Sequence, residues 1–360
     1  MPILLAVFFL SGATALAYQI IWIRLFVLVF GGTVTSMSVV VAAFMGGLAL
    51  GSRLFGAYAE RVANRVRLYG YLELALGAIA FVVFYAIRHL STLVYALPAG
   101  MNANSAMGVG VRLMLSFVIL AVPTMIMGGT LPVLIRAVTA ERKDIMRNTG
   151  LLYAFNTLGA MTGAFLVGFF LIRFFGVTAS TAVAVAVNFL LGAAALLVSG
   201  RFQSTPDTDQ PAQEIIQETS HEKASHAHGK GKRDEIKSPR HDKGTRYLVI
   251  LTLTGFSSLA LEMVWMRMML LTINNTIYLS SIVISVFLFG LGLGGLLMPA
   301  LIPPRFRTAR TMGAILAATA CAVLAGFIVF PSVTQMGFSD FDFYRTWNRI
   351  SLLTAVFFFT

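Results

Sequence analysis

The sequence predicts an all-α membrane protein that crosses the bilayer many times. Three observations lead to this fold class: an apolar composition, a series of long apolar segments and an internal repeat. Of the 360 residues, 58% are hydrophobic and 12% are charged, whereas a soluble domain carries about 25% charged residues. With a mean hydropathy of +0.82, the composition argues against a water-soluble globular fold. The single cysteine argues against a disulfide-stabilised one.

Ten segments are candidate membrane spans, since a transmembrane helix needs about 20 mostly apolar residues. They lie near residues 3–30, 33–55, 68–88, 111–137, 150–173, 177–199, 247–271, 276–300, 311–331 and 349–360. The first has no basic start and leads directly into the second, so we do not expect a cleaved signal sequence. Segment 200–246 is polar and charged, and it predicts a flexible linker between two membrane halves, 1–199 and 247–360.

The placement of arginines predicts which way the helices run. The loops after the second, fourth and eighth spans carry Arg53, Arg61, Arg65, Arg67, Arg136, Arg142, Lys143, Arg147, Arg305, Arg307 and Arg310. The loops on the other side are almost uncharged. Because cytoplasmic loops carry an excess of Lys and Arg, we expect the N-terminus and the linker in the cytoplasm. We interpret the net charge of +12 in the same way, and not as a nucleic-acid-binding surface.

The internal repeat is the strongest signal in the sequence. Residues 12–52 align with residues 255–295 without a gap at an offset of 243, and fourteen of 41 positions are identical. Trp22 falls on Trp265, and Arg24 falls on Arg267. Each copy begins one half of the chain. Two parallel six-helix halves joined by a cytoplasmic loop resemble the major facilitator superfamily, so the repeat predicts that architecture.

The repeat also predicts how far the second half extends. Arg112 opens the fourth span of the first half, and Arg349 opens its counterpart eleven residues before Thr360. A helix that ended there would leave backbone polar groups unsatisfied in the hydrocarbon. We therefore expect the sequence to be a fragment of a longer protein, with its second half truncated.

Five polar side chains within the spans are candidate substrate-binding residues. They are Gln19, Arg24, Glu73, Glu262 and Arg267. Burying such groups in lipid is costly, so they indicate a polar site, here a pocket between the two halves. In the alternative interpretation, the two arginines extend towards the headgroups while the acids and the amide join helices by hydrogen bonds.

A loop motif between the second and third spans suggests a conformational latch. Residues 56–67 contain a glycine, then Glu60, then Arg61 and Arg65, and they resemble the loop motif of facilitator-superfamily transporters. That resemblance implies that the acid and the arginines hold one conformation of the bundle. The alternative is that the arginines only mark the cytoplasmic side.

Other motifs indicate packing and not chemistry. Glycines with small-xxx-small spacing indicate close helix contacts; they are Gly47, Gly51, Gly159, Gly163 and Gly168. Asn156 and Asn188 are predicted to form interhelical hydrogen bonds. Because no nucleophile–base set, metal-ligand cluster or phosphate loop is visible, we predict no catalytic residue, metal site or cofactor in this chain.

Four segments point to a narrower family within the resemblance to the major facilitator superfamily. Residues 9–24, 44–52, 123–132 and 153–160 resemble, in this order, the membrane region of bacterial proteins in which a facilitator domain is fused to a spermidine synthase-like domain. One departure is Gln19, where that family often has Glu. The resemblance implies the bacterial cytoplasmic membrane and a soluble domain like the polyamine aminopropyltransferases, of which nothing is visible here.

Three functions follow from these observations. The first is a transporter-like domain that moves a small polar or charged solute by alternating access, with the lipid bilayer and that solute as its partners. The second is a membrane anchor for a spermidine synthase-like enzyme whose catalytic domain lies beyond residue 360. The third is an assembly partner without transport or catalysis.

Overall fold

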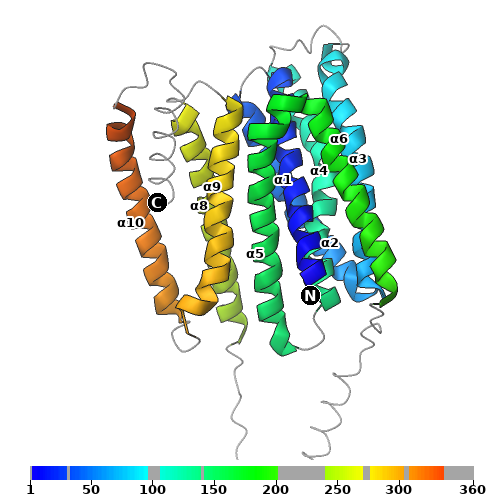
Figure 1. The fold of residues 1–360 in the computed structure, drawn as a ribbon. Helices are drawn as coiled ribbons and strands as arrows, with labels where there is room; N and C mark the ends of the chain where they lie inside the picture. Colours follow the sequence, from blue (N-terminus) through cyan, green and yellow to red (C-terminus); the bar gives the residue numbers. More distant parts are fainter. Residues whose placement is uncertain are drawn as a thin grey trace, which may run out of the picture.

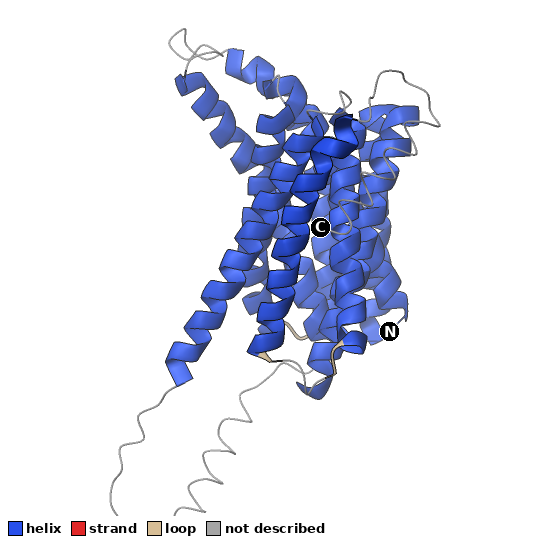
Figure 2. Ribbon diagram, turned by 90° about the vertical axis from the view of Figure 1, so that its left-hand side faces the viewer, coloured by secondary structure: helices blue, strands red, loops and turns tan. Residues whose placement is uncertain are grey.

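The computed structural model describes residues 2–30, 33–95, 106–138, 142–201, 240–270, 276–303 and 308–335. These residues form helices joined by short loops, and no strand occurs among them (Figure 2). The elements are α1 Pro2–Phe30, α2 Thr33–Glu60, α3 Arg65–Tyr95, α4 Ala106–Val138, α5 Arg142–Leu166, the π-helix η2 Val167–Leu171, α6 Ile172–Val198, the 3-10 helix η3 Ser199–Arg201, α8 Arg240–Leu270, α9 Thr276–Leu301 and α10 Ala309–Gln335.

The long apolar helices confirm the prediction of a helical protein that fits a multi-pass membrane fold. Within the described ranges, eight helical runs are long and apolar enough to cross a bilayer. One of them, Thr149–Val198, has 50 residues, more than twice the length that a span needs. Gly176 interrupts this run with φ 76°, a conformation that glycine adopts without strain. Figure 1 shows α5 and α6 running in opposite directions on either side of this region.

The predicted and observed segments agree closely along the described chain. Each predicted span from 3–30 to 311–331 overlaps a helix, and the span predicted at 150–173 covers most of α5, all of η2 and the start of α6. The predicted span at 349–360 lies outside the described residues, so the count of ten stays a prediction. Helix α8 begins at Arg240, inside the segment predicted as a linker, and residues 202–239 of that segment lie outside the described part.

Glycines bring the helices of the first half into backbone contact. Helix α2 packs along α4, α1 along α5 and α3 along α6 (Figure 1). A Cβ on Gly51 would overlap the backbone carbonyl of Met125 on α4, and a Cβ on Gly163 would overlap that of Ala13 on α1. The prediction of close packing at the small-xxx-small positions is thus confirmed, because only a missing side chain permits these approaches.

Helix α9 joins the second part of the chain to the first. It packs along α5 (Figure 1) and the following η2, where Gly168 lies against the side chain of Ser281. Ser285 Oγ on α9 also donates to the carbonyl of Met161 on α5 over 3.3 Å. We call the contact between α9 and the first part of the chain the seam, and small side chains line this part of it.

Candidate functional site

A buried carboxyl group lies where α1, α3 and α6 meet. Glu73 on α3 has no exposed surface. Ser11 Oγ on α1 donates to Glu73 Oε1 over 2.6 Å, and Asn188 Nδ2 on α6 donates to Glu73 Oε2 over 2.6 Å. The carboxyl group therefore joins three helices through its two oxygens, and the predicted interhelical hydrogen bond of Asn188 is confirmed.

Glycines on both helices explain how Glu73 and Asn188 come so close. Gly70 and Gly77 flank Glu73 on its own face of α3, and Gly192 lies one turn after Asn188 on α6. A Cβ on Gly77 would come within 3.3 Å of the Asn188 Cβ, and one on Gly70 within 3.1 Å of the Gly192 carbonyl oxygen. These glycines let the backbones of α3 and α6 approach until the Glu73 carboxyl group reaches the side-chain amide of Asn188.

Two tyrosines complete the group of polar side chains. The Tyr18 hydroxyl donates to Asn188 Oδ1 over 2.9 Å. The Tyr69 hydroxyl is buried beside Ser11 and Glu73, and it makes no hydrogen bond of good geometry. We call these five residues, Ser11, Tyr18, Tyr69, Glu73 and Asn188, the Glu73 cluster.

The Glu73 cluster contains no positive charge. In the part of the chain that the structure describes, no lysine or arginine forms an ion pair or hydrogen bond with Glu73. Within the same residues, no group of three or more His, Cys, Asp or Glu side chains could hold a metal ion. An ionised carboxylate that is buried without a counter-charge is strongly unfavourable, so this arrangement favours a neutral carboxyl group or one that meets a cation.

The other predicted substrate-binding residues lie apart from this cluster. Gln19 is buried and Arg24 is half-buried on α1, while Glu262 is buried and Arg267 is exposed on α8. No hydrogen bond or ion pair among the described residues joins Glu73 to any of these four. The predicted pocket between the two halves therefore stays a prediction, and the observed surroundings of Glu73 lie within the first half.

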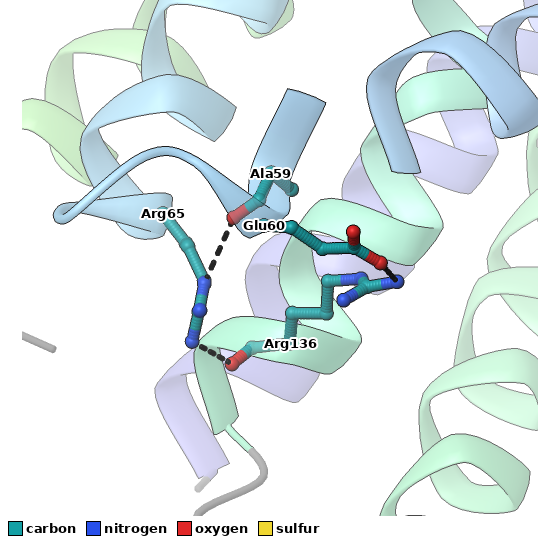
Figure 3. Close-up of polar contacts among 4 residues, drawn as sticks. All are labelled: Ala59, Glu60, Arg65 and Arg136. Carbon is teal, nitrogen blue, oxygen red and sulfur yellow. Dashed lines mark hydrogen bonds and ion pairs between the residues drawn. The ribbon is translucent and has the colours of Figure 1, made fainter. Parts of the chain in front are cut away.

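Two of the three predicted latch residues lie at helix ends: Glu60 ends α2 and Arg65 begins α3, and both contact the end of α4 (Figure 3). Glu60 Oε1 forms an ion pair with Arg136 Nη2 at 2.6 Å. Buried Arg65 ties two helix ends, since its Nε donates to the Ala59 carbonyl over 3.0 Å and its Nη1 donates to the Arg136 carbonyl over 3.3 Å. Arg61 is exposed. The acid therefore pairs with an arginine of α4, which the motif itself does not contain.

The turn before α3 is also tied to the rest of the bundle. Asn64 Oδ1 accepts a hydrogen bond from the backbone N–H of Arg67 over 2.9 Å, the pattern of an N-cap. Asn64 Nδ2 donates to the carbonyl of Ser199 over 2.9 Å. The Asn64 side chain thus caps the N-terminus of α3 and joins it to the end of α6.

Ser11, Tyr18 and Tyr69 were not predicted as site residues. A periodicity signal for them exists in the sequence: Ser11 and Tyr18 are seven residues apart and share a helix face, and Tyr69 and Glu73 are four apart. Nothing in the sequence indicates that these two faces meet. Comparison with family models, with curated proteins and with solved structures finds no match to this chain.

Proposed function

We propose that the protein is a transporter domain of the cytoplasmic membrane that moves a small polar or charged solute by alternating access. The contact between Met37 on α2 and Ser280 on α9 carries this proposal. Ser280 Oγ donates to Met37 Sδ over 3.8 Å. The two residues are separated by the repeat offset of 243, and the same offset relates Thr33 and Thr276, where the two helices begin.

Equivalent residues of a repeat can touch only near the axis that relates the two copies. The contact between Met37 and Ser280 therefore supports two halves that face each other around a pseudo-twofold axis. In transporters built from parallel repeats, the axis runs along the membrane normal, and the solute site lies between halves that rock against each other. The fourteen identical positions of the two copies support the same arrangement.

The seam between the halves supports relative movement. Two polar contacts across it are long: the Ser280–Met37 bond involves sulfur at 3.8 Å, and the Ser285–Met161 bond is 3.3 Å long. No described ion pair crosses it, and the ion pair between Glu60 and Arg136 lies within the first half. Breaking these two bonds costs little free energy when the seam opens.

Amines are the first solutes to test. Glu73 and Glu262 are both buried within candidate spans, and buried acids favour a positively charged partner. The resemblance to proteins that carry a spermidine synthase-like domain leads to the same class. Small organic anions form the second group, because Arg24 and Arg267 also lie in spans.

Uptake into proteoliposomes tests the proposal. We expect the purified protein to accumulate at least one radiolabelled polyamine or other amine, and we expect Glu73→Gln or Glu262→Gln to reduce the initial rate. Cys321→Ser is the matched control, since Cys321 is exposed on α10, and protein-free liposomes give the background. No uptake of any amine or anion would contradict transport, and a membrane anchor or an assembly partner predicts that outcome. Unchanged uptake in both glutamine variants would contradict the role of the two buried acids.

A further inference from the structure

The Glu73 cluster has a feature that a merely structural network does not need. Its carboxyl group has no exposed surface, and no described basic side chain balances it. Interhelical hydrogen bonds could be made by amides and hydroxyls alone, at a lower desolvation cost. An acid at this position therefore indicates a group whose charge changes.

We propose that Glu73 is a proton-binding site, protonated while α1, α3 and α6 are closed around it and deprotonated when movement of these helices admits water. The proton enters from water and returns to water, and no other bond is made or broken. This proposal rests on the proposed transport function, and it names the coupling ion of that function as the proton.

Hydrogen-bond directions favour a proton over a metal cation. Ser11 and Asn188 both direct donor hydrogens at the carboxyl group, whereas a bound cation requires several oxygen lone pairs directed at it. The Tyr18 hydroxyl donates a hydrogen bond to Asn188 Oδ1, and the amide N–H of Asn188 therefore faces Glu73. The amide oxygen is thus turned away from the place that a cation would occupy.

The Tyr69 hydroxyl can form a hydrogen bond with Glu73 in both protonation states of the carboxyl group. It is fully buried beside Glu73, and it makes no hydrogen bond of good geometry. A phenol hydroxyl can both donate and accept. Its oxygen can therefore accept a hydrogen bond from the protonated carboxyl group of Glu73. After the proton leaves, its O–H can donate to the carboxylate, together with Ser11 and Asn188.

No fixed charge locks Glu73 in one state. The titratable groups that face it are Tyr18 on α1 and Tyr69 on α3, and α6 contributes Asn188. Helix α4, which also packs on α3, adds no charged group to these surroundings among the described residues. Arg24 lies 13 residues after Ser11 on α1, about 20 Å further along a helix that rises 1.5 Å per residue.

Infrared spectroscopy of the full chain in lipid detects the proton without a transport assay. We expect the C=O stretch of a protonated carboxylic acid, which shifts in D₂O. Glu73→Gln should remove the component of this band that Glu73 contributes, even if buried Glu262 contributes another. The matched control Glu60→Gln should keep the whole band because Glu60 is exposed and ion-paired. Ser11→Ala should shift the band without removing it, since it deletes the donor to Glu73 Oε1. Should Glu73→Gln fail to fold, Glu73→Asp should move the band.

Three spectroscopic results would overturn the proton site. The first is the lack of a carboxylic acid band in the wild-type protein, and the second is a band that Glu73→Gln, Glu73→Asp and Ser11→Ala all leave unchanged. The third is loss of the band when sodium chloride replaces choline chloride at constant pH, which indicates a metal-cation site. Uptake that keeps its full response to an imposed pH gradient in Glu73→Gln also contradicts the proposal while transport stands. A band assigned to Glu73 without any uptake supports the site and contradicts transport.

Discussion

Gly51 and Gly294 occupy the same position of the internal repeat but have opposite surroundings. A Cβ on Gly51 would overlap the backbone of Met125 on α4, whereas a Cβ on Gly294 would meet no atom within 4 Å. Gly47 and Gly290 differ in the same way, with Thr124 beside the first and open space beside the second. The two copies therefore carry the same glycine motif, but among the described residues another helix packs against these glycines only in the first half.

This difference predicts opposite effects of one substitution at two equivalent sites. Gly51→Ala should lower the stability of the 360-residue chain by about 1–3 kcal/mol, because overpacking forces α2 and α4 apart. Gly294→Ala should stabilise it by up to about 1 kcal/mol, since alanine is the better helix former and has room. Thermal unfolding in detergent, followed by tryptophan fluorescence, measures both effects. A lower melting temperature for Gly294→Ala would show that this face is covered.

The Met37–Ser280 contact predicts a crosslink that reports the closed seam. In a Cys321→Ser background, the pair Met37→Cys and Ser280→Cys should be joined by a short bifunctional thiol reagent. We expect crosslinking to stop uptake and a reducing agent to restore it, because a fixed seam prevents rocking. Leu197→Cys replaces Met37→Cys in the control, as Leu197 is exposed on α6. Full uptake after complete crosslinking would contradict alternating access at this seam.

The Glu60–Arg136 ion pair predicts a small, salt-sensitive coupling. Their side chains are 56% and 37% exposed, and ion pairs with such exposure contribute up to about 1 kcal/mol. A double-mutant cycle with Glu60→Gln and Arg136→Gln should show this coupling at low salt and lose most of it at high salt. The cycle of Glu60→Gln with Arg61→Gln is the control. Stronger coupling to Arg61 would contradict the observed pairing.

Asn188 should matter more for stability than Asn156. Asn188→Leu removes the partners of Glu73 and Tyr18 in a fully buried place, and each orphaned group costs about 1–3 kcal/mol. Asn156→Leu removes one hydrogen bond to the Phe8 carbonyl at a half-buried position. Melting temperatures of the two variants measure the difference. Equal destabilisation would argue that the Glu73 cluster contributes no more than an ordinary interhelical bond.

The sequence by itself determined the helical membrane character and much of the packing chemistry. Apolar runs of span length predict helices because lipid leaves the backbone no other partner than itself, and the described helices follow these runs. The spacing of Gly51 and Gly163 indicated close contacts, and the lone amides Asn156 and Asn188 indicated interhelical bonds. The repeat aligned Trp22 with Trp265 in the sequence, and both are buried. These features are local, or they recur at a fixed offset, so the sequence alone can reveal them.

The partners of the charged groups were decided only by the tertiary structure. Nothing near Glu73 in the sequence identifies Ser11 or Asn188, which lie 62 and 115 residues away. Glu60 likewise pairs with Arg136 across 76 residues and not with the adjacent Arg61. Which side chains meet depends on which helix faces pack together. That choice is set by the approach distances that glycines permit over the whole bundle, a property of three-dimensional packing that no single segment contains.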